Sequence, residues 1–255
     1  MTRGMKRGDF GAACAGAAVL AGAGLLTAAA PAAAAGDRPR LVVPRVDHVP
    51  VIEEFLDMDG EAGGAGGLAR FEGFVQRQPS DGSPSSRHTV FHLGYDSDNL
   101  YAVFQAFDDP RLVRGNLTRR DEALDDNNDD QVCLWLDTFN DRRRAYYLGV
   151  NPAGVQYDAL YSEGGPVNGD KTFDMVWHSS ARRTDRGFVV LFSVPFRSLR
   201  FPDAPQQNFG VLAERWIGRH AEWVFWPRVA LGVQGFLSQA AEATGLERVS
   251  PGRNI

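Results

Sequence analysis

The 255-residue sequence has little cysteine, and no segment shows sustained helical periodicity. It contains two cysteines, Cys14 and Cys133, and Cys14 lies in the N-terminal segment that we expect to be removed. An internal disulfide is therefore excluded in the mature chain, and stability must come from an apolar core. The net charge of −5 argues against nucleic acid as a partner.

The short motifs of several common enzyme classes are also missing. The sequence has no G-x-S-x-G elbow, no H-E-x-x-H zinc motif and no phosphate-binding G-x-x-x-x-G-K-[ST] loop. A glycosidase needs only two suitably spaced carboxylates, and acidic residues are abundant here. A hydrolase acting on O-glycosyl bonds therefore stays open as an alternative to a protein without catalysis.

Residues 1–35 are predicted to be a secretory signal peptide. Arg3, Lys6 and Arg7 precede an apolar, alanine-rich run over 11–30, and small residues at 33–35 suit signal-peptidase cleavage. An N-terminal membrane anchor is the alternative, but glycine and alanine supply little hydrophobicity and no basic cluster follows directly. We expect a secreted or periplasmic protein.

The mature chain reads as a succession of short strands. Val132, Leu134 and Leu136 fall on one face of such a strand, while Cys133 and Trp135 fall on the other. The pattern predicts an all-β fold, a jelly-roll-like antiparallel sandwich of two sheets over 71–249. An extended, glycine-rich lead-in over 36–70 precedes it, and a tail over 250–255 follows. Strands are predicted over 71–77, 89–95, 99–107, 131–137, 145–151, 155–161, 174–183, 188–194, 208–217 and 222–227.

An acidic loop over 121–130 is a candidate cation site. Its density of carboxylates suits a hard cation such as calcium, which binds six to eight oxygens. The candidate ligands are Asp125, Asp126, Asp129 and Asp130. The alternative is a solvated loop whose charge is countered by Arg119 and Arg120.

Aromatic and arginine side chains near turns are candidate ligand contacts. Sugar rings stack their C–H faces on aromatic planes, so Trp223 and Trp226, which alternation places on opposite faces of one strand, are candidates. Arg144 ends the run 142–144 between two strands and could fork onto sugar hydroxyls or a carboxylate. The alternative is a charged hairpin turn whose side chains pair across its ends.

Several motifs together resemble the family 9 carbohydrate-binding modules. The resemblance covers about 71–247, and it is closest to the version found at the N-terminus of exported bacterial proteins in which a predicted outer-membrane β-barrel follows. The residues that carry it are Gly94-Tyr95-Asp96, Asn99-Leu100-Tyr101, Phe107-Asp108-Asp109-Pro110, Asp129-Asp130-Gln131-Val132, Asp137-Thr138-Phe139-Asn140-Asp141-Arg142-Arg143, Asn151-Pro152-Ala153-Gly154-Val155-Gln156 and Val194-Pro195-Phe196-Arg197-Ser198-Leu199-Arg200-Phe201-Pro202.

The resemblance also implies positions for a sugar site. Family members hold sugar between two tryptophans, with a glutamate, an arginine and an asparagine on its hydroxyls. Four of these five positions fall near Asn127 and at Cys133, Gly149 and Asn151, and only Asn151 keeps the family's residue type. The second tryptophan would fall in 229–235, which has none.

We therefore predict a non-catalytic carbohydrate-binding module whose partner is a polysaccharide or oligosaccharide. Asn151, Arg144, Trp226 and Trp223 are the predicted ligand contacts. The alternatives are an accessory domain of a glycoside-hydrolysing protein that uses carboxylates of 121–130, and a module that has lost sugar binding and contacts an outer-membrane or envelope protein. The end at Ile255 is expected to mark a free-standing module or a truncated form of a longer protein.

Overall fold

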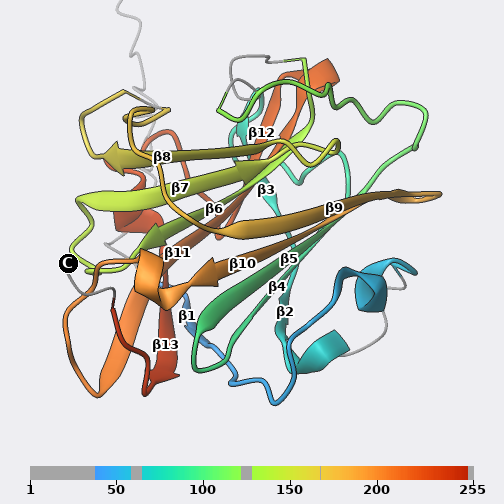
Figure 1. Cartoon of the computed structure of the whole chain (residues 1–255). Helices are drawn as coiled ribbons and strands as arrows, with labels where there is room; N and C mark the ends of the chain where they lie inside the picture. The colour runs from blue at the N-terminus through green and yellow to red at the C-terminus, as the bar shows by residue number, and fades with distance from the viewer. Residues whose placement is uncertain (1–37, 59–64, 122–127, 167, 252–255) are drawn as a thin grey trace, which may run out of the picture. The chain divides into compact units, whose positions relative to one another are not determined.

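Antiparallel strands make up most of the regular structure of this protein (Figure 1). The computed structural model describes residues 38–58, 65–121, 128–166 and 168–251, which belong to one unit spanning Asp37–Ile255. The predicted signal peptide lies outside the described residues. The strands are β1 (Arg40–Val42), β2 (Ala69–Phe71), β3 (Val75–Gln78), β4 (Thr89–Tyr95), β5 (Asn99–Phe107), β6 (Gln131–Asp137), β7 (Arg144–Val150), β8 (Gln156–Ser162), β9 (His178–Thr184), β10 (Gly187–Pro195), β11 (Gln206–Ile217), β12 (Glu222–Trp226) and β13 (Ala241–Glu247).

The strands form two sheets, which confirms the predicted two-sheet sandwich. The large sheet has the order β1-β13-β11-β6-β7-β8, and the end of β11 also pairs with β12, which pairs with β3. The small sheet has the order β2-β4-β5-β10-β9. The pairs are antiparallel except for β1 with β13, which run parallel. β1 and β13 were not predicted from the sequence.

The main core lies between the sheets and follows the two-residue alternation of the strands. Val132, Leu134 and Leu136 of β6 point into it, as do Phe188 and Phe192 of β10. Trp177 stacks on Phe192 with ring centroids 5.5 Å apart and 7° between the planes. The predicted alternation of β6 is therefore confirmed.

Both sheets also carry apolar clusters on their outer faces. On the small sheet, Val189 and Leu191 of β10 pack under Phe55 of η1 (Ile52–Phe55) and Met58. The outer face of the large sheet is covered by the segment 227–240, which includes η6 (Leu237–Gln239). Burial on two faces explains why several strands read as continuous apolar runs instead of alternating ones.

The described helices are 3-10 turns of three or four residues, which include η2 (Ala65–Gly67), η4 (Phe196–Ser198) and η5 (Gly218–His220). None of them has the length and hydropathy needed to span a membrane. The strand predicted over 174–183 begins only at His178, because 174–177 is irregular and brings Trp177 to the edge of the main core.

Candidate functional site

Asn151, a predicted ligand contact, is buried and holds the turn between β7 and β8. Its Oδ1 accepts the backbone N–H groups of Ala153 and Val155 at 3.0 Å each. Its Nδ2 donates to the carbonyl of Asn116 at 2.8 Å and to Asp129 Oδ2 at 3.0 Å. The side chain thus has a structural role in this turn, and its contact with a sugar stays a prediction.

Asp129 and Asp130 stabilise the same end of the sandwich through hydrogen bonds. The Asp129 carboxylate accepts the backbone N–H of Asn116 at 2.7 Å and its side-chain amide at 2.9 Å. The Asp130 carboxylate accepts the N–H groups of Arg114 at 2.8 Å and Gly218 at 3.1 Å. Burial raises the pKa of Asp130 above its ordinary value. Both carboxylates are therefore held by protein donors.

The other two candidate calcium ligands, Asp125 and Asp126, lie outside the described residues. Across the described ranges, His, Cys, Asp and Glu side chains form no group of three or more that could hold a metal ion. The calcium site over 125–130 therefore stays a prediction.

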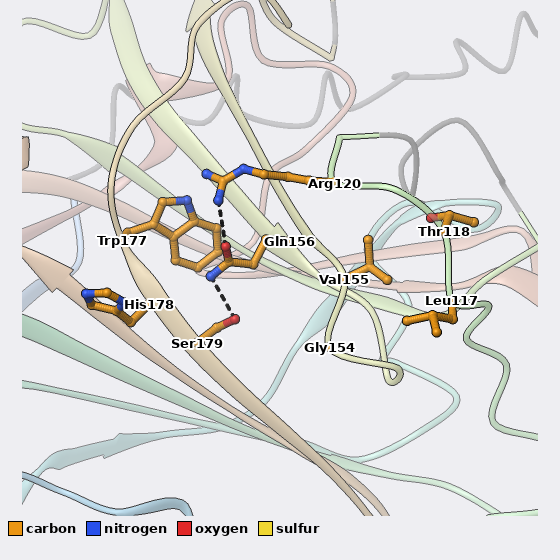
Figure 2. Close-up of a pocket in the computed structure, with 9 residues that line it drawn as sticks. All are labelled: Leu117, Thr118, Arg120, Gly154, Val155, Gln156, Trp177, His178 and Ser179. Atoms are coloured by element: carbon orange, nitrogen blue, oxygen red, sulfur yellow. Dashed lines mark hydrogen bonds between the residues drawn. The ribbon is translucent and has the colours of Figure 1, made fainter.

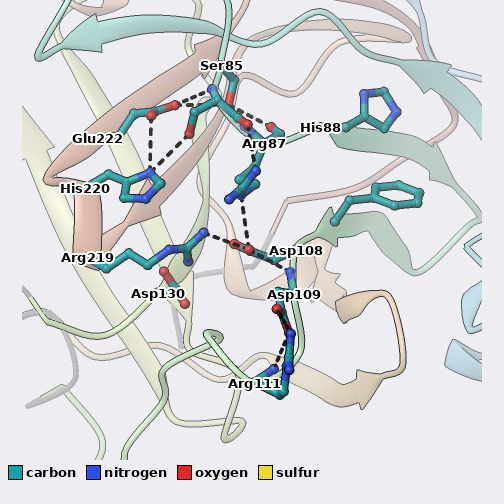
Figure 3. A network of polar contacts seen from close by, with 12 residues as sticks. Ser85, Arg87, His88, Asp108, Asp109, Arg111, Asp130, Arg219, His220 and Glu222 are labelled. Atoms are coloured by element: carbon teal, nitrogen blue, oxygen red, sulfur yellow. Dashed lines mark hydrogen bonds and ion pairs between the residues drawn. The ribbon is translucent and has the colours of Figure 1, made fainter.

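A buried ionic network next to Asp130 joins the two sheets (Figure 3). Asp108, which follows β5, accepts Nη2 of Arg215 at 3.2 Å and Nη2 of Arg219 at 2.7 Å. Arg87 lies 3.2 Å from the same carboxylate. Arg215 comes from β11 and also donates to Thr89 of β4 at 3.0 Å. Three guanidinium groups thus share the buried Asp108 carboxylate, and this network fixes one end of the sandwich.

The two predicted tryptophans lie on opposite faces of β12, as alternation requires, and both are half-buried. Trp226 packs toward the main core, with its ring centroid 4.4 Å from that of Phe71. Trp223 packs on the outer face, 5.5 Å from Phe236. Neither is an exposed platform, and their contact with a sugar stays a prediction.

The outer face of the large sheet is filled by the protein's own aromatic rings. Phe236 stacks on Trp135 with centroids 5.7 Å apart and 7° between the planes. The Arg77 guanidinium lies 4.2 Å from the Phe236 centroid. Cys133 and Gly149, two positions implied by the family resemblance, pair with each other on this sheet, and Cys133 is fully buried. The segment 227–240 therefore covers the face that carries these two of the positions implied by the resemblance.

A buried carboxylate lies under that cover. Glu214 of β11 accepts Nε1–H of Trp135 at 2.6 Å and the Tyr147 hydroxyl at 3.2 Å. Burial raises the pKa of Glu214 to about 7, although these donors act in the opposite direction. The Glu214 carboxyl group is buried, so its protonation affects the stability of the sheet.

A polar pocket of about 450 Å³ lies between β8 and β9, at the edges of the two sheets (Figure 2). Arg120 donates to Gln156 Oε1 at 2.8 Å and to the buried carboxylate of Asp158. Gln156 in turn donates to Ser179 Oγ at 3.0 Å. Trp177 lines the pocket but is only 3% exposed, so its indole ring is not open for stacking. These polar groups already bind one another, which makes this a weak sugar site.

Phe139, in the turn between β6 and β7, is 53% exposed. Among the described residues it is the one phenylalanine, tyrosine or tryptophan side chain in the exposed class. The turn is fixed by Asp137, whose carboxylate accepts the N–H of Arg142 at 2.8 Å, and by left-handed backbone at Asn140 (φ 50°). An exposed aromatic ring on an ordered turn is what stacking on a sugar requires.

Phe139 lines a pocket of about 320 Å³ that also contains the predicted residue Arg144. Tyr146 and Phe173 contribute aromatic wall, with ring centroids 5.6 Å apart. The hydroxyl of Tyr146 accepts the backbone N–H of Arg200 at 2.9 Å. The full lining is Thr138, Phe139, Arg144, Ala145, Tyr146, Leu160, Phe173 and Arg200. We call this the Phe139 pocket.

The Phe139 pocket combines apolar and cationic groups. Burial raises the pKa of Tyr146, while the hydrogen bond from Arg200 and the charges of Arg200 and Arg144 act to lower it. The charges of both guanidinium groups therefore oppose the rise that burial causes in the pKa of the Tyr146 hydroxyl. Thr138 donates its hydroxyl to the Arg200 carbonyl, which ties the β6–β7 turn to the segment after η4. The arrangement can stack a ring and bind polar substituents, but it holds no carboxyl pair for hydrolysis among its described lining residues.

Comparison with known proteins agrees with the fold. No protein-family model and no curated protein matches the sequence. A family 9 carbohydrate-binding module from Caldicellulosiruptor kristjanssonii in complex with cellotriose superimposes with a TM-score of 0.52 and 14% identity, over 84% of this chain and 95% of that chain. A second structure from the same organism, in complex with glucose, gives 0.51 and 16%, over 85% and 98%.

A Bacteroides uniformis protein, itself a candidate carbohydrate-binding protein, superimposes with a TM-score of 0.60 and 11% identity, over 82% of this chain and 99% of that chain. The fold of this chain is thus a β-sandwich like that of family 9 carbohydrate-binding modules, as the sequence motifs predicted. Identities this low show the fold alone.

Proposed function

We propose that this protein is a non-catalytic carbohydrate-binding module of an exported bacterial protein. The support is the sandwich fold, which it shares with modules solved in complex with cellotriose and with glucose. The proposed partner is an oligosaccharide or polysaccharide outside the cytoplasm. The proposed binding site is the Phe139 pocket, away from the covered outer face of the large sheet.

One observation carries this choice of site. Phe139 is the exposed aromatic ring of the described chain, and it lies beside Arg144, the predicted arginine contact. Sugar recognition combines an aromatic plane with planar hydrogen-bond donors, and the pocket supplies both. The volume of about 320 Å³ falls at the low end of small-molecule pockets, about 300–1,000 Å³.

A binding titration with a truncation of the ring tests the proposal. We expect the purified protein to bind at least one glycan on an array without releasing reducing sugar. We expect Phe139→Ala to weaken that binding at least about tenfold, because the stacking surface is lost. The measurement is isothermal titration calorimetry with the best glycan from the array.

The control is Leu117→Ala, which removes an 87% exposed apolar side chain at the other pocket. Both substitutions are on the surface, so the melting temperature should change little in either variant. Equal affinity of Phe139→Ala and the wild type would reject the Phe139 pocket as the site. An array without any bound glycan would reject the function itself.

The alternative function, glycoside hydrolysis, has a different structural requirement. It requires carboxylates of 121–130 to reach a substrate, whereas those of Asp129 and Asp130 accept backbone N–H groups within the protein. Release of reducing sugar that disappears in Asp130→Asn would favour that alternative. A protein partner in the envelope is favoured by no specific contact in the described chain.

A further inference from the structure

We propose that the Phe139 pocket takes a sugar that carries a carboxylate, such as a uronic acid unit of an acidic polysaccharide. This inference rests on the proposed carbohydrate binding and names its substrate class. Three observations support it. Arginines line the pocket, the nearby carboxylates are hydrogen-bonded within their own turns, and an aromatic wall lies beside the arginines.

The charges of the lining residues have one sign. Arg144 and Arg200 are the charged side chains among the described residues that line the pocket, and both are exposed. The whole chain has a net charge of −5. A pocket whose charge is opposite to that of the chain is expected to attract anionic ligands over neutral ones.

The nearest carboxylates on the β6–β7 turn do not pair with Arg144. Asp137 accepts the N–H of Arg142 at 2.8 Å, and Asp141 accepts the N–H of Arg143 at 2.8 Å. In the described part of the chain, the side chains of the run 142–144 form no ion pair. The predicted pairing across the ends of this turn is therefore not what the structure shows.

Asp170 approaches from the other side, since its backbone pairs with Leu160 of the pocket wall. Its carboxylate accepts the backbone N–H of Thr172 at 2.9 Å and the hydroxyl of Thr172 at 2.7 Å. It is fully exposed, so water screens its charge. The carboxylates of Asp137, Asp141 and Asp170 are thus hydrogen-bonded within their own turns, and none of them pairs with Arg144. We therefore expect the guanidinium of Arg144 to bind the anion.

The geometry suits a ring with one planar anionic substituent. A guanidinium binds a carboxylate through two parallel N–H donors, which a neutral hydroxymethyl group cannot match. Phe139 and Phe173 offer apolar surface for the C–H face of the sugar. The pocket therefore combines a stacking surface with an anion-binding group, which is what recognition of a uronate requires.

The test compares uronate oligosaccharides with their methyl esters, which keep the sugar skeleton and lose the charge. Trimers of galacturonate, glucuronate and mannuronate, each with its ester, are titrated into the purified protein by calorimetry. We expect at least one acid to bind about tenfold or more tighter than its ester, since a charge-assisted hydrogen bond supplies that difference. Arg144→Gln should reduce the preference to about threefold or less, because it weakens binding of the acid more than binding of the ester.

Arg143→Gln is the matched control, because it removes an exposed arginine of the same turn that does not line the pocket. It should keep the preference for the acid. Loss of preference in both variants would show that only diffuse charge acts, and would overturn the inference.

An ester or a neutral glycan that binds as tightly as the acid would also overturn the inference and leave the proposed function standing. Failure of every glycan, neutral or acidic, would reject the proposed function and the inference together. The melting temperature of each variant is measured alongside, so a loss of fold is recognised directly.

Discussion

At the scale of single residues, several motifs of the sequence prove to be structural supports. Asp108 pairs with Arg215 of β11 and Arg219 of η5, and Asp130 accepts two backbone N–H groups. Asn151 closes the β7–β8 turn. These polar groups are buried, and a buried polar group is stable only when it is hydrogen-bonded. The motifs that predicted the fold therefore do so because they hold it together.

Glu214 gives a pH prediction at this scale. Burial raises its pKa to about 7 from an ordinary value of 4.5. Between these values the folded protein holds a proton that the unfolded chain has released. The free energy of unfolding should therefore fall as pH rises from 4.5 to 7, by about 3 kcal/mol from this group. Chemical unfolding followed by fluorescence at pH 4.5, 6 and 8 measures it.

Glu214→Gln isolates the contribution of this carboxyl group to the pH dependence of the free energy of unfolding. The amide keeps an acceptor for Trp135 and cannot ionise, so the variant should gain stability relative to the wild type above pH 7. Glu247→Gln, an exposed glutamate at the end of β13, should keep the wild-type pH slope. A wild-type slope in Glu214→Gln would contradict this account.

At the scale of elements, the segment 227–240 is what closes the outer face of the large sheet. Phe236 contacts four aromatic residues there, Trp135, Tyr161, Trp223 and Phe225. Phe236→Ala should lower the free energy of unfolding by about 2 kcal/mol, because a half-buried ring leaves this cluster. Urea unfolding measures the difference.

Val233→Ala in the same segment is the control, since this side chain is exposed. It should change the free energy of unfolding by less than about 0.5 kcal/mol. Equal effects of the two substitutions would show that the segment does not pack on the sheet through Phe236.

The strands with strong alternation were the predictable part of the fold. β4, β5 and β6 begin and end at the predicted residues, because turn-forming residues bound each apolar run. β13 was missed because its inward residues include Ala241 and Ala243, too small to give an apolar signal, and Gly245 adopts a positive φ of 86°. β1 is three residues long and exists through its pairing with β13.

The site was less predictable for a physical reason. The sequence indicates that Arg144 lies near a turn, but it does not say which aromatic rings stay in water. Tryptophan is the usual platform, yet Trp223 and Trp226 are half-buried by rings from distant segments. Phe139 stands within the polar turn Thr138–Arg143, and an aromatic residue in such a turn is the signal that could have identified it.

At the scale of the whole molecule, the proposed function requires export, since its glycan partner lies outside the cytoplasm. We expect cleavage near Ala35, after the alanine-rich run that follows Arg3, Lys6 and Arg7. Intact-mass measurement of the protein recovered from the periplasm or medium should show a chain that begins at about residue 36. A chain retained in the cell with residues 1–35 intact would contradict the prediction.

The central claim is that a sugar binds over Phe139 and beside Arg144, and a crystal structure of the complex tests it most directly. The account predicts a sugar ring stacked on Phe139, with a carboxylate within hydrogen-bond distance of the Arg144 guanidinium. A sugar bound instead on the outer face of the large sheet after displacement of Phe236, or at the Arg120 pocket between β8 and β9, would contradict it.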